Sequence, residues 1–290
     1  MKTYQVDILE NITAEAFKEK YLEQQKPMLL KGGCKNWQAT KKWGLDYFQE
    51  HFAKTQVPVK RFENDEIIKE QELLGEYCQQ LRAYEENPGG QFPSYCHDIP
   101  IFNSEPALKD DICDFPVEFL PEIYKNWWQY CQFFLGPAGS VTPLHFDCLL
   151  THNLFFQIRG TKRFTLMPYS EAENCGQHNW RWFKLDPEQI DERAFSDYNR
   201  ANTQVVDVEA GDILFMPGGT LHHVRSLDTC ISFNIDFHDI SSAWQGVEAV
   251  NKGIPEENFY YNSLTLMRLL NRAPESVFFK YYKSYLNYVS

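Results

Sequence analysis

Between residues 129 and 238 the sequence breaks into short apolar runs, and turn-forming residues separate each run from the next. The runs are QYCQFFLGP, VTPLHFD, NLFFQIRG, KRFTLMP, TQVVDVEAGDILFMPGG, HHVRSL and TCISFNIDF. Short strands with Gly and Pro between them are typical of an all-β sandwich or barrel. We therefore predict a mainly β core.

The segment before this core combines helical and strand signals. Thr13 can cap a helix that carries Phe17 and Tyr21, and KPMLLKGG then reads as a short buried strand closed by glycines. Residues 65–86 have apolar positions at helical spacing and predict an amphipathic helix interrupted by Gly75.

A polar insertion at 170–203 divides the predicted strands, and the tail is rich in Tyr, Phe and Leu at helical spacing. The chain is therefore expected to carry helical additions at both ends of the β core. The predicted regions are an N-terminal part at 1–128 that packs on the core, a catalytic core at 129–240 and a helical part at 241–290.

Composition and charge exclude several classes of protein. The formal charge of −12 repels phosphate backbones, so nucleic acid is not an expected partner. The eight cysteines include no CxxC pair, which leaves a zinc ribbon or thioredoxin motif unsupported and favours free thiols. No apolar run approaches the ~18 residues of a membrane span, and the first residues lack the apolar segment of a secretory signal. We expect a soluble, cytoplasmic protein without a membrane partner.

Candidate metal ligands lie in two of the runs. Residues i and i+2 of a strand point to the same side, so His145 and Asp147 in TPLHFD would aim an imidazole and a carboxylate at one point. A third ligand can come from the strand that opens at His222 after a Pro-Gly-Gly turn. Two His and one carboxylate leave positions of a non-haem Fe(II) open. Side-chain parity puts His222 and His223 on opposite faces and does not choose between them.

One lysine in the run KRFTLMP is a candidate anion-binding group. Lys162, Phe164 and Leu166 share a face of the predicted strand, so the ammonium would be buried with apolar neighbours. A buried lysine requires an anion. The alternative is a surface lysine beside Arg163 in a hairpin.

Along VTPLHFDCLLTHNLFFQIRGTKRFTLMP and GDILFMPGGTLHHVRSLDTCISFNIDF, the chain resembles the JmjC hydroxylases grouped with the factor-inhibiting-HIF asparaginyl hydroxylase. The resemblance implies a double-stranded β-helix, which is a jelly-roll or cupin-like barrel, with iron held by His145, Asp147 and His222. In that family the second ligand His is followed by any residue and then Val or Ile. This pattern selects His222 and leaves His223 as a packing or supporting residue.

The same resemblance implies Fe(II), 2-oxoglutarate and O2 as cofactor and cosubstrates. In the family, the lysine after the glycine turn binds the far carboxylate of 2-oxoglutarate, and a threonine and an upstream tyrosine assist it. These residues match Lys162, Thr142 and Tyr95. Asn153 and Asn234 correspond to asparagines that line the cosubstrate pocket, although either could instead cap a local turn.

The chain departs from the family pattern at three points. It carries CLLTH between Asp147 and Asn153, about two residues more than the nearest family pattern. Thr220 and Leu221 replace the aromatic pair that usually precedes the second ligand His. Asp236 stands where many relatives have Trp, so contacts with the substrate should differ.

The expected function is hydroxylation of an amino-acid side chain in a protein or peptide by a 2-oxoglutarate-dependent dioxygenase. The alternatives are a hydroxylase of a free amino acid or natural-product intermediate, and a non-catalytic cupin-like binding protein. Asp236 shares a strand face with Asn234 near the pocket mouth, which favours a basic substrate. The alternative is that Asp236 pairs with an internal arginine such as Arg159 or Arg225.

The last predicted helix carries a broad aromatic stripe. Phe278, Tyr281, Tyr282 and Tyr285 lie at spacings of three, four and seven, and Tyr288 extends them. Such a stripe must be covered. We expect a homodimer through the C-terminal helices, and the alternative is that the stripe folds back on the core.

Overall fold

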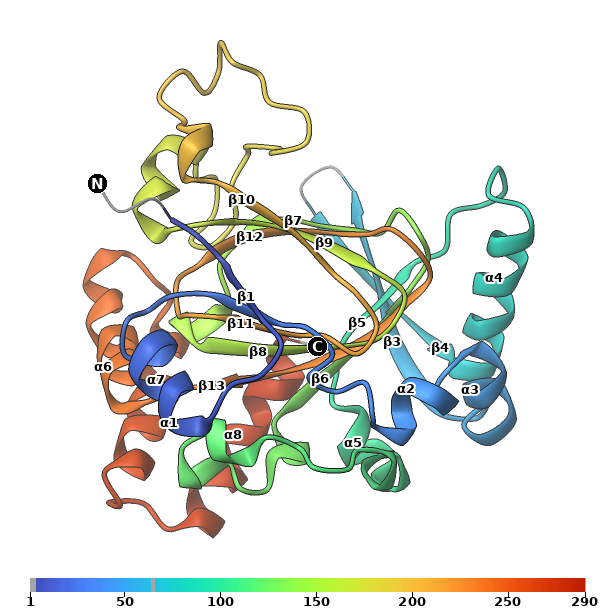
Figure 1. Cartoon of the computed structure of the whole chain (residues 1–290), viewed down its shortest axis with the longest axis horizontal. Coiled ribbons are helices and arrows are strands. Elements are labelled where there is room, and N and C mark those ends of the chain that lie inside the picture. Colours follow the sequence, from blue (N-terminus) through green and yellow to red (C-terminus); the bar gives the residue numbers. More distant parts are fainter. Residues whose placement is uncertain (1–3, 64–65, 290) are drawn as a thin grey trace.

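Two β-sheets face each other across the centre of the molecule (Figure 1). The computed structural model describes residues 4–63 and 66–289, with side chains for all of these except 62, 63, 66, 67, 252 and 286–289. The larger sheet has the strand order β1 (Asp7–Leu9), β2 (Met28–Leu30), β11 (Ile213–Met216), β8 (His152–Arg159), β13 (Cys230–Phe237), β6 (Cys131–Gly136), β5 (Tyr95–Ile99), β3 (Gln56–Glu63) and β4 (Glu66–Leu73). The smaller sheet has the order β10 (Gln204–Val208), β9 (Lys162–Met167), β12 (Leu221–Ser226) and β7 (Val141–His145).

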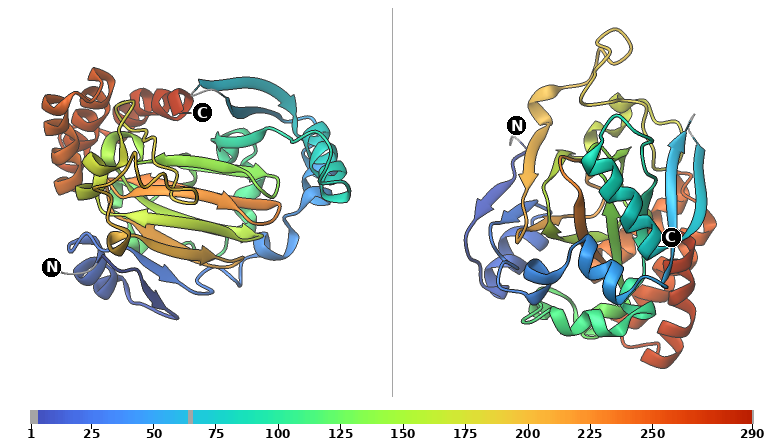
Figure 2. Two further views of the ribbon diagram at one scale, coloured as in Figure 1. Left: turned by 90° about the horizontal axis from the view of Figure 1, so that it is seen from above. Right: turned by 90° about the vertical axis from the view of Figure 1, so that its right-hand side faces the viewer.

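Helices cover the larger sheet and its edges. The α-helices are α1 (Ala14–Phe17), α2 (Gln38–Lys42), α3 (Leu45–His51), α4 (Leu74–Glu86), α5 (Ile101–Ser104), α6 (Ile240–Glu248), α7 (Glu256–Leu269) and α8 (Glu275–Val289). The short helices are η1 (Lys18–Leu22, a π-helix), η2 (Pro106–Asp111), η3 (Val117–Phe119), η4 (Glu122–Tyr124), η5 (Trp127–Gln129), η6 (Cys148–Leu150), η7 (Tyr169–Cys175), η8 (Arg200–Asn202) and η9 (Ala249–Lys252). Figure 2 shows α6, α7 and α8 gathered on one side of the strand layers.

Each apolar run between residues 129 and 238 contains a strand, as the sequence predicts. The run at 203–219 holds two strands, β10 and β11, because the chain turns at residues 209–212. Gly211 adopts φ +95° in this turn, a conformation that side chains disfavour. The Asp212 carboxylate accepts a hydrogen bond from the Glu209 amide at 2.9 Å and closes the turn.

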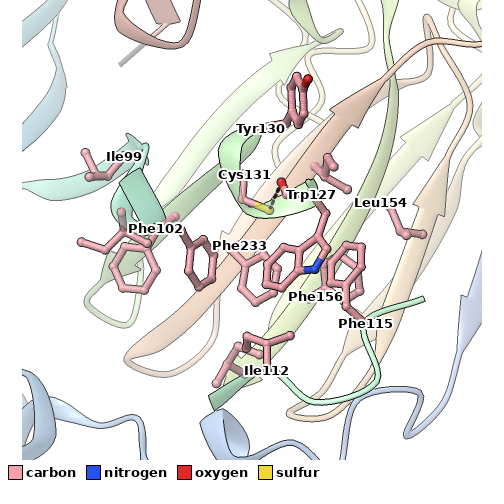
Figure 3. Packing of buried hydrophobic residues seen from close by; sticks show 14 of the residues in the cluster. Ile99, Phe102, Ile112, Phe115, Trp127, Tyr130, Cys131, Leu154, Phe156 and Phe233 are labelled. Carbon is pink, nitrogen blue, oxygen red and sulfur yellow. Dashed lines mark hydrogen bonds between the residues drawn. The ribbon is translucent and has the colours of Figure 1, made fainter. Parts of the chain in front are cut away.

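Alternation along the strands builds two separate apolar layers. Phe155 of β8 packs between the sheets on Phe164 of β9, with ring centroids 4.9 Å apart. Its neighbour Phe156 points to the opposite face of the same strand and stacks on Phe233 of β13 at 4.9 Å. Figure 3 shows this outer layer, where Trp127 of η5 stacks on Phe233 with ring centroids 6.3 Å apart. The helical additions therefore share one hydrophobic core with the larger sheet.

The predicted helix at 65–86 is wrong in its first half. Glu66–Leu73 forms β4, an antiparallel partner of β3 through its whole length, and only the second half forms a helix, α4. Alternating Ile, Lys and Glu suits either structure, and the cross-strand pairing with β3 decides it. Gly75 does not interrupt α4, because it lies in the first turn, where its amide donates to the Ala53 carbonyl at 3.1 Å.

The helices near the two ends follow their sequence signals more closely. Thr13 caps α1, where its hydroxyl accepts a hydrogen bond from the Ala16 amide at 3.2 Å, and Phe17 is fully buried. Within residues 4–63 and 66–289, every helix is too short or too polar to cross a membrane.

The aromatic stripe of α8 packs largely against its own chain. Phe278, Tyr282 and Tyr285 are buried, and the rings of Phe278 and Tyr282 lie 6.4 and 5.6 Å from that of Tyr130. Tyr281 stays 46% exposed, and the side chain of Tyr288 lies outside the described residues. The stripe therefore folds back on the core at these three positions, and the homodimer stays a prediction.

The insertion at 170–203 is tied to the smaller sheet. Its residue Trp182 forms an antiparallel bridge with His145 of β7, and the Phe183 amide donates to the Leu144 carbonyl at 3.0 Å. Phe183 and Leu185 are buried in a cluster with Leu144 and Phe146. The insertion, whose composition indicates a polar loop, therefore pairs with β7, the strand that carries His145.

Candidate active site

The three predicted metal ligands converge between β7 and β12. These strands are antiparallel neighbours, and His222 lies directly opposite His145. The Nε2 atoms of His145 and His222 lie 3.8 and 3.5 Å from Asp147 Oδ1, and the three ligand atoms lie within 4.8 Å of one another. Two imidazoles and one carboxylate on one face form the facial arrangement that suits Fe(II).

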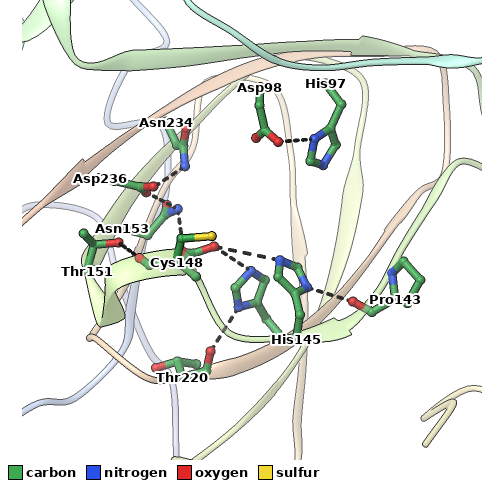
Figure 4. A network of polar contacts seen from close by, with 12 residues as sticks. His97, Asp98, Pro143, His145, Cys148, Thr151, Asn153, Thr220, Asn234 and Asp236 are labelled. Carbon is green, nitrogen blue, oxygen red and sulfur yellow. Dashed lines mark hydrogen bonds and ion pairs between the residues drawn. The ribbon is translucent and has the colours of Figure 1, made fainter. Parts of the chain in front are cut away.

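Backbone carbonyls orient both imidazoles. A carbonyl can only accept, so His145 Nδ1 donates to Pro143 O at 2.7 Å and His222 Nδ1 donates to Thr220 O at 3.0 Å (Figure 4). Each Nε2 therefore presents its lone pair to the centre of the group. Burial, and then the neighbouring His222, lowers the pKa of His145 well below its usual value, which keeps the ring in the neutral form that binds metals.

The outer oxygen of Asp147 is held by an amide network. Asn153 of β8 donates to Asp147 Oδ2 and to Asp236 Oδ1, both at 3.0 Å (Figure 4). Asn234 of β13 also donates to Asp236 Oδ1 at 3.0 Å. Burial, and then the charge of Asp147, raises the pKa of Asp236 well above its usual value. Both asparagines thus line the pocket, and neither caps a local turn through a hydrogen bond from its side chain in the described chain.

Lys162 lies deep in the same pocket. It is 2% exposed, and its Nζ donates to Tyr95 Oη at 2.6 Å and Ser232 Oγ at 3.1 Å. Burial lowers its pKa to about 8, and no carboxylate of the described residues lies within 4.0 Å of its Nζ. The alternative of a surface lysine is wrong, because Lys162 is buried. Its neighbour Arg163 points outward and pairs with Asp207.

Aromatic rings and a threonine complete this end of the pocket. The ring centroids of Phe134, Tyr95 and Phe155 lie 5.0, 5.3 and 5.3 Å from Lys162 Nζ. Thr142 of β7 is buried and lines the pocket. Of the two residues expected beside Lys162, Tyr95 contacts its ammonium and Thr142 lines the same pocket, whereas Ser232 and the two phenylalanines were not predicted.

His223 lies on the other face of β12, as parity predicts. Asp186 and Glu188 of the insertion form a second His and carboxylate group with it. Arg225 already pairs with both oxygens of Glu188. His223 and His222 therefore face different surroundings, and only His222 lies with His145 and Asp147.

The extra residues between Asp147 and Asn153 form a tight loop. Leu149 and Leu150 adopt φ +64° and +60° within it, and the Leu150 carbonyl lies against Gly218 of the Pro-Gly-Gly turn. A Cβ at Gly218 would lie 2.3 Å from that oxygen, so this position requires glycine. The loop absorbs the additional length, and Asn153 still reaches Asp147.

The family model of the cupin-like domain matches residues 13–243 of the chain. The chain belongs to the cupin-like domain family. This match confirms the predicted cupin-like fold. It extends through the N-terminal part as well as the strands, which agrees with their shared hydrophobic core.

Curated relatives of this cupin-like domain carry JmjC and oxygenase names. Lysine-specific demethylase 8 of Xenopus tropicalis is 30% identical over 232 residues, which cover 77% of this chain and 50% of the relative. The 2-oxoglutarate and iron-dependent oxygenase JMJD4 of Gallus gallus is 27% identical and covers 79% and 59%. The bifunctional peptidase and (3S)-lysyl hydroxylase JMJD7 of Homo sapiens is 24% identical and covers 72% and 76%.

The chain spans about half the length of the first curated relatives that it matches. The membership of the JmjC group predicted from the sequence is confirmed, whereas the finer likeness to the asparaginyl hydroxylase stays a prediction.

Several residues at or beside the pocket of this cupin-like domain were not predicted from the sequence. Ser232 could have been found, because it stands two residues before Asn234 on the same strand face. The others carry no local signal, because distant segments bring them to the site. They are His97 and Asp98 of β5, Arg181 and Trp182 of the insertion, and Tyr285 of α8.

Asp236 lines the pocket without an arginine partner among the described residues. Arg225 pairs with Glu188, and the guanidinium of Arg159 lies against Gly44 at the far end of β8. The predicted alternative, an ion pair with Arg159 or Arg225, is therefore wrong. The hydrogen bonds that Asp236 accepts come from Asn153 and Asn234.

Proposed function

We propose that the chain is an Fe(II)- and 2-oxoglutarate-dependent dioxygenase that hydroxylates an amino-acid side chain in a protein or peptide. One observation carries the proposal: the facial group of His145, Asp147 and His222 lines the same pocket as the buried Lys162. A metal site alone would suit many enzymes. A metal site that shares a pocket with a buried cation lacking a carboxylate partner within the described chain suits a cosubstrate that is both a chelator and an anion.

In this proposal His145, Asp147 and His222 hold Fe(II). Both Nε2 atoms and the carboxylate are free to ligate, because the Nδ1 atoms are engaged by carbonyls and Asn153 occupies the outer oxygen of Asp147. The bound metal supplies the activation of O2 that chemistry at a C–H bond requires. His223 is left out of this site.

The far carboxylate of 2-oxoglutarate binds Lys162, with Tyr95 and Thr142 beside it and Asn153 and Asn234 on the adjoining wall. Lys162 is held in place by Tyr95 and Ser232, so little side-chain entropy is lost on binding. The surrounding phenyl rings keep the ion pair away from water, which strengthens it.

A protein substrate with a basic residue suits this site best. Asp236 lines the pocket, has no cationic partner within ion-pair distance in the described chain and has a raised pKa. A Lys or Arg side chain of a substrate would lower that pKa and pair with the resulting carboxylate. The relatives named lysine-specific demethylase and lysyl hydroxylase support a basic substrate. A free amino acid, a natural-product intermediate and a non-catalytic binding role remain the alternatives.

Succinate release tests the proposed activity. Protein purified without oxygen and loaded with iron should convert 2-oxoglutarate to succinate when O2 is admitted, and a peptide substrate should gain the mass of one oxygen atom. Absence of succinate at any iron concentration would contradict the proposal. Asp236→Asn should weaken the preference for basic peptides in the same assay, and an unchanged preference would remove Asp236 from the substrate site.

We also propose a cytoplasmic homodimer in which region 1–128 packs on the catalytic core at 129–240 and the helical region 241–290 forms the dimer interface. Exposed apolar side chains on the C-terminal helices support an interface there, among them Trp244, Phe259, Tyr260, Met267 and Tyr281. Solution scattering at micromolar concentration should give the mass of two chains. The mass of one chain would exclude the dimer.

A further inference from the structure

The insertion supplies one wall of the pocket. Its pairing with β7 places Arg181 and Trp182 in the pocket lining, where the Trp182 ring stacks on His145 with centroids 4.7 Å apart and an interplanar angle of 26°. The Phe146 amide donates to the Arg181 carbonyl at 3.3 Å, so the backbone on both sides of His145 is held by the insertion. Arg181 therefore occupies a fixed place beside the metal ligands.

The Arg181 guanidinium has no hydrogen-bond acceptor and no ion-pair partner in the described chain. Its Cζ lies 4.5 Å from the centroid of the Trp182 ring, which positions the planar group. No residue of the described chain accepts a hydrogen bond from this guanidinium, and no carboxylate there lies within 4.0 Å of it. Burial opposes its charge, but Cys148, Asp98 and Asp147 outweigh this and raise its pKa above the usual value.

Three carboxylates interact electrostatically with Arg181, namely Asp98, Asp147 and Asp236, and Asp236 lies beyond ion-pair distance from it. The other two are already engaged elsewhere. Asp98 pairs with Lys60 Nζ at 3.0 Å and with His97 Nδ1 at 2.6 Å. Asp147 faces the two ligand imidazoles with one oxygen and accepts from Asn153 with the other. Lys162 is the other cation of the pocket lining and belongs to the cosubstrate in the proposed function. Arg181 is thus left with a planar fork of donors that matches a carboxylate.

We propose that Arg181 binds a carboxylate of the substrate, so that the substrate carries both a cationic group and a carboxylate close to the hydroxylated carbon. The cationic group pairs with Asp236 and the carboxylate with Arg181. Such a carboxylate is either an acidic side chain next to a basic residue or the free α-carboxylate of a terminal or free amino acid. This inference rests on the proposed function and names the substrate class within it.

Matched pairs of small probes test this inference without turnover. Nα-acetyl-L-lysine and its carboxamide differ only in the α-carboxylate, and the capped dipeptides acetyl-Lys-Asp-amide and acetyl-Lys-Asn-amide differ only in an acidic side chain. Binding is measured by ligand-observed NMR on the full chain loaded with Zn(II) and 2-oxoglutarate. We expect one acid to bind about tenfold more tightly than its amide partner, as for a charge-assisted bidentate pair. The pair that shows the difference identifies the source of the carboxylate.

Substitutions at Arg181 test whether this residue causes the preference for the acid over the amide. In Arg181→Gln the acid and its amide should bind within about twofold of each other, while Arg181→Lys should keep part of the difference. Arg193→Gln is the matched control, because Arg193 lies exposed in the same insertion and outside the pocket lining. It should keep the full preference.

Three results would overturn the inference. One is a wild-type protein that binds acid and amide equally, or binds none of the four probes at 10 mM, roughly the weakest affinity that such a pair would give. Another is a preference that persists in Arg181→Gln. The third is a loss of 2-oxoglutarate affinity of about tenfold or more in Arg181→Gln, which would make Arg181 a cosubstrate anchor. Failure of the proposed function is distinguished by the separate succinate assay on iron-loaded wild-type protein.

Discussion

The two ends of the pocket are built in different ways. At one end, Lys162 is enclosed by side chains from the strands β5, β6, β8, β9 and β13. At the other end, Arg181 comes from the insertion, and Tyr285 comes from α8. The first end is therefore part of the sheet framework, whereas the second depends on segments added to it.

The two cations also meet opposite electrostatic surroundings. Burial lowers the pKa of Lys162 to about 8, since its neighbours are mainly aromatic rings and hydroxyls. Nearby Cys148, Asp98 and Asp147 outweigh burial at Arg181 and raise its pKa. The enclosed end thus gains most from an anion that arrives with the cosubstrate. The end formed by the insertion keeps its charge at any physiological pH and can serve to select substrates.

The largest effect is expected at the metal ligands. Asp147→Ala and His222→Ala should each abolish iron-dependent succinate formation, because a site with two ligands holds Fe(II) weakly and in the wrong direction. His223→Ala should retain turnover within about threefold, since His223 faces the opposite side of β12. Activity in His222→Ala together with an inactive His223→Ala would reverse the choice of ligand.

Strand alternation explains why the enclosed end could be predicted from the sequence. His145 with Asp147, Lys162 with Phe164, and Asn234 with Asp236 are pairs at i and i+2, which a strand must place on one face. Local chemistry therefore indicated both the metal group and the buried cation. The identity of His222 needed the family pattern, because parity separates it from His223 without choosing.

The end formed by the insertion could not be predicted, because it depends on pairing between distant segments. Arg181 and Trp182 lie in a stretch whose polar composition reads as a loop, and their place follows from the bridge between Trp182 and His145. Asp98 adopts φ +60°, which no strand pattern predicts. The hairpin of β3 and β4 was missed for the same reason, since its partner strand and not its composition decides its structure.

Truncation of the buried Lys162 should weaken the binding of 2-oxoglutarate without weakening the binding of iron. Lys162→Ala should raise the KM for 2-oxoglutarate by about 10- to 100-fold, because a carboxylate would be buried without its charge-assisted partner. Iron affinity should be spared, since Lys162 contacts none of the three ligands. Arg163→Ala is the matched control, because Arg163 is on the same strand and points to solvent. An unchanged KM in Lys162→Ala would dismiss the assigned role.

The lowered pKa of Lys162 predicts a pH dependence that belongs to the enclosed end. An amine with a pKa of about 8 is charged below that pH and loses its charge above it. The KM for 2-oxoglutarate should therefore rise about tenfold between pH 7 and pH 9, as the charged fraction falls about tenfold. Lys162→Arg should flatten this profile, because a guanidinium stays charged throughout. A wild-type KM that is constant over this range would contradict the expected titration.

The smallest expected effect is a loss of metal affinity on substitution of Trp182, which belongs to the insertion and contacts a metal ligand. Its indole stacks on His145 at 4.7 Å, so removing it frees one face of a ligand ring whose Nδ1 hydrogen bond remains. Contacts that support a ligand without touching the metal affect binding less than the ligand itself, so Trp182→Ala should weaken iron affinity by about three- to tenfold. Trp182→Phe keeps an aromatic surface and should retain most of the affinity. Metal titration followed by ligand-field absorption of Co(II) measures both variants without turnover. If Trp182→Ala binds Co(II) as tightly as the wild type, the insertion serves the substrate end alone, and the metal site belongs wholly to the strand framework.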